Sequence, residues 1–353
     1  MKKRFALSFL IVSSTLIAAL AQNTSPTTSG LLLGLRQDDA KTGRSSYRTL
    51  WIAPSSNKDL GAKLQAQAPG ILVARDDGWW RVGVARETIG TGGIDVLYAH
   101  PATDRGLKNL SHAPAGSCIE GDYDSNFDYQ ETILFVGSKY VSHQKRASAL
   151  KPCDRYSAFN ALEVNRFDQL KFAAEDHKPF SVEFSPENIK LSEFGQEAQD
   201  AHTSAWLDSV NALSSEDQSK LGEQKTPEDN NWGVVRRSGR WAIRAGIVST
   251  LETFFDVTVL PEILAAVVGS PEPALPYSLT AKDWMFSPNK DLMAQITVNK
   301  LELYKVWGGK PSIGLVLSIP LKQGEAVVMV QWAVGKGLMR WSKEVPKLLI
   351  RFP

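Results

Sequence analysis

Cysteine and histidine are scarce in this chain, with two and five residues respectively among 353. The histidines are scattered, and none forms a His-x-x-x-His or His-Glu-x-x-His pair of the kind that binds zinc. The sequence also lacks Gly-x-Ser-x-Gly, and its glycine clusters do not have the spacing of a phosphate-binding loop. These absences exclude the enzyme classes that such motifs define. They leave open catalysis by carboxylates that come from distant strands.

A large excess of charge of either sign is also missing. The formal net charge is +2, and removal of Lys2, Lys3 and Arg4 would leave −1. A surface this close to neutral gives no electrostatic reason to expect nucleic acid or anionic lipid as a partner.

Apart from the N-terminus, the chain has no long apolar run. Three basic residues precede an apolar stretch of about 16 residues, which is short of the roughly 20 that span a bilayer. Ala19-Leu20-Ala21 then gives the small-x-small pattern of a cleavage site, and the pattern predicts a signal peptide over residues 1–21. We expect the mature chain to be periplasmic or secreted, with no membrane span. Residues 22–30, rich in Thr and Ser, predict a flexible leader.

The two cysteines, Cys118 and Cys153, are expected to form one disulfide bond in an oxidising compartment. In the chain-entropy model, closing a loop of about 35 residues stabilises the fold by roughly 4 kcal/mol. The alternative is two unpaired thiols.

Runs of β-forming residues recur along the chain and are separated by Gly, Asn, Asp and Ser. Asp77-Gly78 and Ser238-Gly239 are typical turn dipeptides between two such runs. We predict five hairpins, in which the paired strands are 70–75 with 79–84, 131–136 with 139–142, 232–237 with 240–244, 292–297 with 300–306, and 326–334 with 338–341. The pattern indicates an all-β fold of mainly antiparallel hairpins, because it shows no β-α-β alternation.

One segment breaks this pattern. Residues 196–220 are rich in Ala, Gln, Glu, Asp and Ser, and Trp206, Val210 and Leu213 fall at helical spacing. We predict a helical insertion here, with a linker that continues to residue 231. It separates an N-terminal β-hairpin region, 31–195, from a C-terminal one, 232–353, and the two regions form either one domain or two.

Two stretches resemble repeat units of exported bacterial β-propellers. Phe286-Ser-Pro-Asn-Lys-Asp-Leu-Met-Ala294, followed by Asn299-Lys-Leu-Glu-Leu-Tyr-Lys-Val306, is similar to the strand–turn–strand core of a propeller blade. Residues 231–243 are similar to a WG-type hairpin repeat. The resemblance implies a β-propeller-like arrangement of short sheets. The hairpins are irregularly spaced, and a pair of β-sandwich-like domains is the alternative fold.

The chain contains ten tryptophans, and two of them, Trp79 and Trp80, are adjacent. Neighbouring side chains in a strand point to opposite faces, so both indoles are buried only if both faces of the sheet are covered. Most of the tryptophans are expected in the core. We take Trp79 or Trp80 as the candidate ligand-contact residue, because exposed aromatic rings stack on sugars and peptides.

An acidic segment, Gly121-Asp-Tyr-Asp-Ser-Asn-Phe-Asp-Tyr129, is the one local group with metal-binding character. Asp122, Asp124, Asn126 and Asp128 place oxygen ligands at alternate positions, as calcium loops do. The segment resembles the calcium loops of FG-GAP-type propeller blades, although Phe127 replaces the usual turn glycine. The alternative is a solvated acidic loop without metal.

These features favour an extracytoplasmic binding or interaction module without an evident catalytic motif. Its ligand would be a glycan, a peptide or a protein, and no cofactor other than Ca²⁺ is indicated. The alternative is a cell-envelope or polysaccharide hydrolase with strand-borne carboxylates, for which the candidates are Asp76, Asp77, Glu183 and Asp283.

Overall fold

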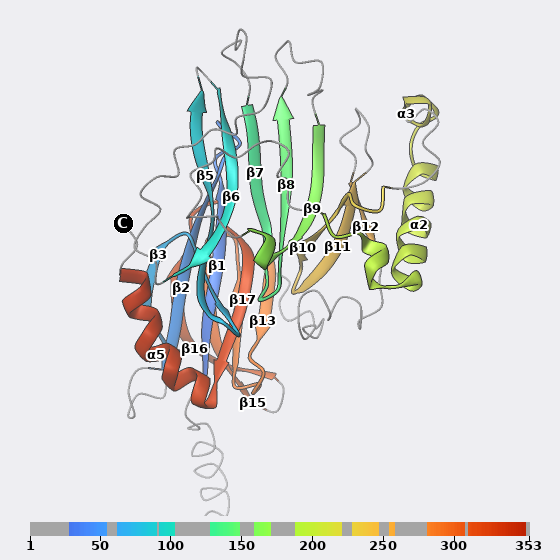
Figure 1. Ribbon diagram of the computed structural model, residues 1–353. Helices are drawn as coiled ribbons and strands as arrows, with labels where there is room; N and C mark the ends of the chain where they lie inside the picture. Colours follow the sequence, from blue (N-terminus) through green and yellow to red (C-terminus); the bar gives the residue numbers. More distant parts are fainter. Residues whose placement is uncertain are drawn as a thin grey trace, which may run out of the picture.

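The computed structural model describes residues 28–54, 62–89, 92–102, 128–148, 159–170, 188–220, 228–246, 254–257, 281–307 and 310–350. Their strands form four sheets, and the pairing is antiparallel except between β6 and β7. The prediction of a mainly antiparallel β fold is therefore confirmed. Helices occur in two places, beside the C-terminal sheets and at the C-terminal end (Figure 1).

The first sheet joins the two ends of the chain. Its order is β17-β1-β2-β3, with bounds Ala326–Val334, Ser29–Asp38, Ser45–Pro54 and Ala62–Pro69. We call it the central sheet, because hydrophobic cores lie on both of its faces. Leu31, Leu33 and Leu35 of β1 face one core, and Leu32 faces the other. This alternation is the two-residue period of a strand, and it explains why β1 is apolar along most of its length.

The second sheet has six strands in chain order. They are β4 (Ile71–Arg75), β5 (Gly78–Ile89), β6 (Gly92–Pro101), β7 (Asp128–Val136), β8 (Tyr140–Ser148) and β9 (Phe159–Arg166). The strands β6 and β7 pair in parallel through two residue pairs, Gly93 with Asp128 and Ile94 with Tyr129. This short join lets the β4–β6 and β7–β9 meanders behave as two smaller sheets. A 3₁₀ turn, η2 (Phe167–Leu170), follows β9.

The remaining sheets are consecutive meanders. One contains β10 (Trp232–Arg237), β11 (Arg240–Gly246) and β12 (Phe254–Val257), and the other contains β13 (Asp283–Phe286), β14 (Leu292–Ile296), β15 (Lys300–Trp307) and β16 (Lys310–Pro320). The β10–β11 turn uses left-handed backbone at Ser238 (φ 40°) and Gly239 (φ 82°). That conformation fits a tight two-residue hairpin.

The first core unites these sheets with one face of the central sheet. It includes Leu33 of β1, Phe135 of β7, Trp232 of β10 and Met285 of β13. The second core lies on the other face, between the central sheet, β4–β8 and the C-terminal helix. Full burial of one such large apolar side chain contributes about 1.5–3 kcal/mol, so these two cores hold the sheets together.

Four of the five predicted hairpins are confirmed, as β4–β5, β7–β8, β10–β11 and β14–β15. The fifth is wrong in its second half, because residues 338–341 lie in a helix, α5 (Gly335–Ile350). Trp341, Val345, Leu348 and Leu349 recur at helical spacing and are buried on the central sheet. A single face of a helix buries all four, whereas a strand would turn neighbours to opposite faces.

The helical insertion is confirmed as α2 (Gln196–Asn211) and α3 (Ser215–Lys220), which follow a 3₁₀ turn, η3 (Leu191–Phe194). Trp206 is buried and Val210 packs against the same core. Ser214 accepts a hydrogen bond from the backbone N–H of Asp217 (3.1 Å) and so caps α3. None of the helices in the described ranges is long and apolar enough to cross a membrane.

The expected leader ends earlier than residue 30. Strand β1 begins at Ser29, whose side chain is fully buried and donates a hydrogen bond to Asp291 (2.6 Å). Ser29 pairs with Val334 and Gly30 pairs with Ala333, so Ser29 and Gly30 belong to the central sheet. Residues 1–27 lie outside the described part of the chain.

Candidate functional site

The tryptophan pair on β5 is packed against protein on both faces of its sheet. Trp80 is 5% exposed, lies edge-on to Phe167 and donates a hydrogen bond to Asp77 (3.0 Å). Trp79 is half-buried and donates to Glu344 of α5 (2.7 Å). The helix that the sequence failed to predict covers the face of Trp79. Trp80 is thus a core residue, and Trp79 is partly covered by α5.

The predicted calcium loop and the predicted disulfide fall mostly outside the described residues. This applies to Asp122, Asp124, Asn126, Cys118 and Cys153. Asp128, the first residue of β7, is described, and its two carboxylate oxygens accept hydrogen bonds from Arg86 and from Gln130 (2.6 Å). Within the described ranges, no group of three or more His, Cys, Asp and Glu side chains is arranged to hold a metal ion.

The candidate catalytic carboxylates that the structure describes lie on separate elements, with Asp76 and Asp77 in the β4–β5 turn and Asp283 on β13. Asp283 accepts two hydrogen bonds from Arg236 (3.0 and 2.9 Å) and one from the Gly239 backbone. Asp77 bonds Arg75 and Trp80 in the β4–β5 turn. Asp76 is exposed in that turn, and Glu183 lies outside the described residues. The two partnered residues hold turns and strands in place.

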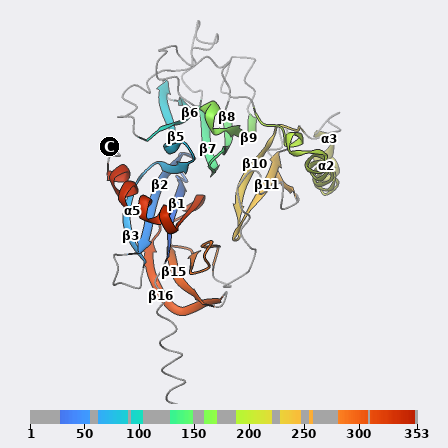
Figure 2. The same ribbon diagram turned by 60° about the horizontal axis from the view of Figure 1, so that its bottom comes forward.

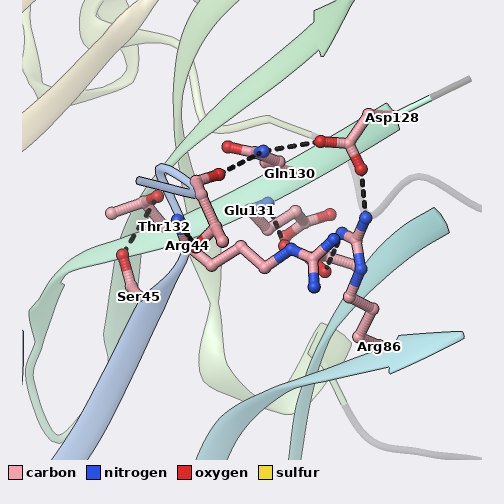
Figure 3. Close-up of polar contacts among 9 residues, drawn as sticks. Arg44, Ser45, Arg86, Asp128, Gln130, Glu131 and Thr132 are labelled. Atoms are coloured by element: carbon pink, nitrogen blue, oxygen red, sulfur yellow. Dashed lines mark hydrogen bonds and ion pairs between the residues drawn. The ribbon is translucent and has the colours of Figure 1, made fainter. Parts of the chain in front are cut away.

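A different set of polar side chains is gathered on the inner faces of β5–β9. We call it the polar cluster, and its members are Arg86, Asp95, Asp128, Tyr129, Glu131, His143, Lys145, Glu163 and Asn165. The polar cluster adjoins the second core. Val84 and Leu97 belong to that core, and they lie two residues from Arg86 on β5 and from Asp95 on β6. Figure 3 shows how part of the cluster lies across β5 and β7. The interior of this sheet thus changes from apolar to charged along its strands.

Arg86 bridges two carboxylates in the outer half of the cluster. Its guanidinium donates to Asp95 (2.8 Å) and to Asp128. Asp95 also accepts a hydrogen bond from the backbone N–H of Glu131 (3.1 Å), so it joins β6 to β7 where their direct pairing is only two residues long. Burial raises the pKa of Asp95 above its ordinary value, and the bonds from Arg86 offset only part of this effect.

Glu131 and His143 form the inner half. The Nδ1 atom of His143 lies 3.1 Å from Oε2 of Glu131, and Tyr129 donates to Oε1 (3.0 Å). His143 is 1% exposed. Burial alone raises the pKa of Glu131, but the nearby His143 and Lys145 outweigh it, and the pKa lies below its ordinary value. Glu131 is therefore held as a carboxylate inside the protein.

A chain of amides reaches the Nε2 atom of His143. Asn188 donates to the backbone carbonyl of Asn230 (3.5 Å), so its side-chain oxygen accepts from Asn165 (3.1 Å). The oxygen of Asn165 then faces Nε2 of His143 at 2.6 Å. The two ring nitrogens of His143 thus face Asn165 on one side and Glu131 on the other, so the imidazole on β8 links β7 and β9.

The cations of the cluster are paired within it, and its carboxylates outnumber them. Lys145 lies 2.6 Å from Glu163, and Glu163 lies 3.6 Å from the Nε2 atom of His143. Arg86 and Lys145 each lie within ion-pair distance of a carboxylate. Breaking such a buried pair leaves an uncompensated charge and is strongly destabilising. The chemistry of the cluster is therefore that of a clamp between strands β5–β9.

One cation beside the cluster is open to solvent. Arg44 lies in the turn between β1 and β2, where Gly43 has φ 68°. This turn is bound to β7, because Gln130 donates to the Thr42 carbonyl (3.3 Å) and Ser45 to the Thr132 hydroxyl (3.4 Å). The Arg44 side chain reaches toward the Asp128 side of the cluster (Figure 3), and its charge helps to lower the pKa of Asp128. Among the described residues, Arg44 has no ion-pair partner.

Comparison with known proteins places the chain in no family. No protein-family profile matches it, and no curated protein sequence matches it. Among solved structures, it matches a "putative 6-phosphogluconolactonase" from Bacteroides uniformis at 10% identity, with 87% of this chain and 99% of the other covered. The TM-score is 0.22, which does not establish a shared fold.

Sequence reasoning missed the polar cluster because its members come from five strands. A signal was present in the β7–β8 hairpin, where Tyr129 and Glu131 alternate with neighbours on one strand and His143 and Lys145 on the other. The hairpin register pairs Glu131 with Lys145, and the next strand pair sets His143 beside Glu163. The register shift between Ile133 and Phe135 makes this alignment hard to predict from the turn alone.

Proposed function

We propose that the protein is an exported binding module of β-propeller-like organisation that takes an acidic ligand beside Arg44. The observation that carries this proposal is that the exposed guanidinium of Arg44 belongs to a turn that is bonded to the sheet. The turn that bears Arg44 is fixed to β7, and β7 is fixed to β5, β6 and β8 by the polar cluster. A charge held in this way loses little freedom when a ligand binds.

The order of the strands supports the propeller-like part of the proposal. The chain runs through successive antiparallel meanders, β4–β6, β7–β9, β10–β12 and β13–β16. The last strand, β17, then pairs with β1 and completes a meander with β2 and β3. A sheet that combines strands from both chain ends is the way in which many propellers close their ring of blades.

Binding is favoured over the hydrolase alternative by the state of the carboxylates. A glycosidase needs one carboxylic acid and one carboxylate that flank the bond of a bound sugar. Glu131 and Asp95 are almost fully buried, and each is engaged by a cation or by a backbone N–H. The open group in this region is a cation, which favours an acidic glycan or peptide as the ligand.

The experiment that tests the ligand site compares Arg44→Ala with Lys41→Ala. Both cations are exposed in the same turn, so the two variants change net charge equally. The probes are matched acidic and neutral oligosaccharides and peptides, measured by calorimetric titration. We expect acidic probes alone to bind, and Arg44→Ala to weaken binding at least tenfold, in the range of a charged hydrogen bond, with Lys41→Ala close to wild type. Equal loss in both variants, or equal binding of neutral probes, contradicts the proposal.

Export forms part of the same proposal. Intact-mass analysis of exported protein reports the cleavage site and the oxidation state of the thiols together. We expect a chain that begins at Gln22 with Cys118 and Cys153 bonded to each other. An intact Met1 terminus contradicts export with cleavage. Two alkylatable thiols contradict the disulfide.

A further inference from the structure

The outward side of helix α5 carries a line of cations. Lys336, Arg340, Lys343 and Lys347 follow one another at spacings of four, three and four residues, and all four are exposed. At 3.6 residues per turn, these spacings place them along one narrow stripe. The buried side of α5 lies opposite this stripe, against the central sheet. Figure 2 shows α5 on the outside of the molecule, beside β2 and β3.

The cations of this stripe are largely unneutralised. Arg340 lies 3.9 Å from Glu344, which also accepts a hydrogen bond from Trp79. Lys336, Lys343 and Lys347 have no ion-pair partner in the described part of the chain. Met339 lies beside the stripe and is 63% exposed. The helix thus presents three free charges, one shared charge and one apolar side chain to solvent.

We propose that this stripe docks the protein onto an anionic lipid bilayer. Its position on the outermost line of a surface helix lets all four cations touch a plane at once, and Met339 is placed to enter the headgroup region. The apolar face of α5 is already buried, so the contact is electrostatic docking and not insertion of the helix. Each Lys or Arg near an anionic membrane surface strengthens binding by about fivefold. Four such residues together strengthen binding by several hundredfold.

This inference is independent of the Arg44 site and corrects an expectation from composition. The near-neutral net charge gave no reason to expect anionic lipid, because it averages over the whole surface. The stripe shows only when residues 335–350 are read with a helical period. Under the strand period predicted for residues 338–341, the cations would not share a face.

The test is co-sedimentation of the purified mature protein with phosphatidylcholine vesicles, with and without phosphatidylglycerol. The stripe variant replaces Lys336, Arg340, Lys343 and Lys347 by Gln. The control variant replaces four exposed cations elsewhere by Gln, with the same change in charge: Lys41, Lys139, Arg240 and Lys300. We expect binding only with phosphatidylglycerol, a loss of several hundredfold in the stripe variant and a small loss in the control. Binding should weaken as salt is raised.

Three results would overturn the proposal. These are no binding of wild type to phosphatidylglycerol vesicles, an equal loss in both variants, and binding of soluble polygalacturonate without binding of vesicles. If far-UV circular dichroism shows that the stripe variant does not fold, Lys343→Gln alone replaces it, with an expected loss of about fivefold. No change in Lys343→Gln then also overturns the proposal.

Discussion

At the scale of single residues, the negative charge of Glu131 is the first feature to test. Glu131 is 8% exposed and faces His143 and Tyr129. We expect Glu131→Gln to lower the free energy of unfolding by about 3–5 kcal/mol, because it removes a buried negative charge that faces His143 and Lys145. Urea unfolding at neutral pH measures this loss.

A matched control is Glu302→Gln. Glu302 also accepts a hydrogen bond from a tyrosine two residues along its strand, Tyr304 (3.0 Å), and one from Gln295 (3.0 Å). Both of these partners are neutral, so we expect a loss of about 1 kcal/mol. Similar losses in the two variants would show that the negative charge of Glu131 adds nothing beyond its hydrogen bonds.

The acid side of the pH profile tests the same residue. The pKa of Glu131 lies below its ordinary value of 4.5 in the folded state. Its contribution is therefore present above 4.5 and is lost as the pH falls through the lower, folded pKa. We expect the difference in stability between wild type and Glu131→Gln to shrink as the pH is lowered below 4.5. A constant difference from neutral pH down to pH 3 would contradict this assignment.

The individual site residues were largely beyond prediction from the sequence. Asp128 was singled out as a calcium ligand, and the structure joins its carboxylate to Arg86. Arg86 lies 42 residues away in sequence, and no local pattern links the two. Trp79 and Trp80 were correctly assigned to a strand. How far Trp79 is covered depends on helix α5, and only residues 338–341 of this segment were assigned a structure, that of a strand.

At the scale of elements, the sequence predicted the hairpins in which a two-residue turn joins two runs of β-forming residues. The β10–β11 hairpin forms on the predicted Ser238-Gly239 turn. The β4–β5 hairpin also forms, but Arg75 pairs with Gly78, so its turn residues are Asp76 and Asp77 and not the predicted Asp77-Gly78. The prediction for the segment after β17 was wrong because four residues, Leu338 to Trp341, are too few to distinguish a strand from the buried face of a helix. Val345, Leu348 and Leu349 extend the apolar pattern at helical spacing, and a longer window would have shown this.

Helix α5 should be a substantial source of stability. Trp341 is buried between Trp51 and Trp79, with ring centroids 5.8 and 5.0 Å away. We expect Trp341→Ala to lower the free energy of unfolding by about 3–5 kcal/mol, because it opens a cavity in the second core. Met339→Ala, two residues earlier on the exposed side, should change it by less than about 0.5 kcal/mol. If the two variants lose similar stability in urea, α5 does not pack as described.

At the scale of the whole molecule, the pairing of β1 with β17 decides how the chain is organised. Ser29 pairs with Val334, about 300 residues away, and no turn or motif in the sequence predicts such a contact. The first core adds side chains from both sides of the helical insertion, including Val164 and Trp232. Composition predicts a boundary at residues 196–231. Both the central sheet and the first core nevertheless combine residues from before and after this segment.

This organisation predicts that the two regions unfold together. Leu33 is fully buried in the first core and pairs with both Val330 and Leu50. Leu33→Ala should cost about 2–5 kcal/mol. In mild denaturant, hydrogen-exchange mass spectrometry should show faster exchange in β7–β9 and in β10–β15 to the same extent, because both sets of strands contact the core that Leu33 fills. Leu207→Ala, on the exposed side of α2, should leave exchange in both regions at the wild-type rate. Faster exchange confined to one side of residues 196–231 would instead indicate two domains that fold separately.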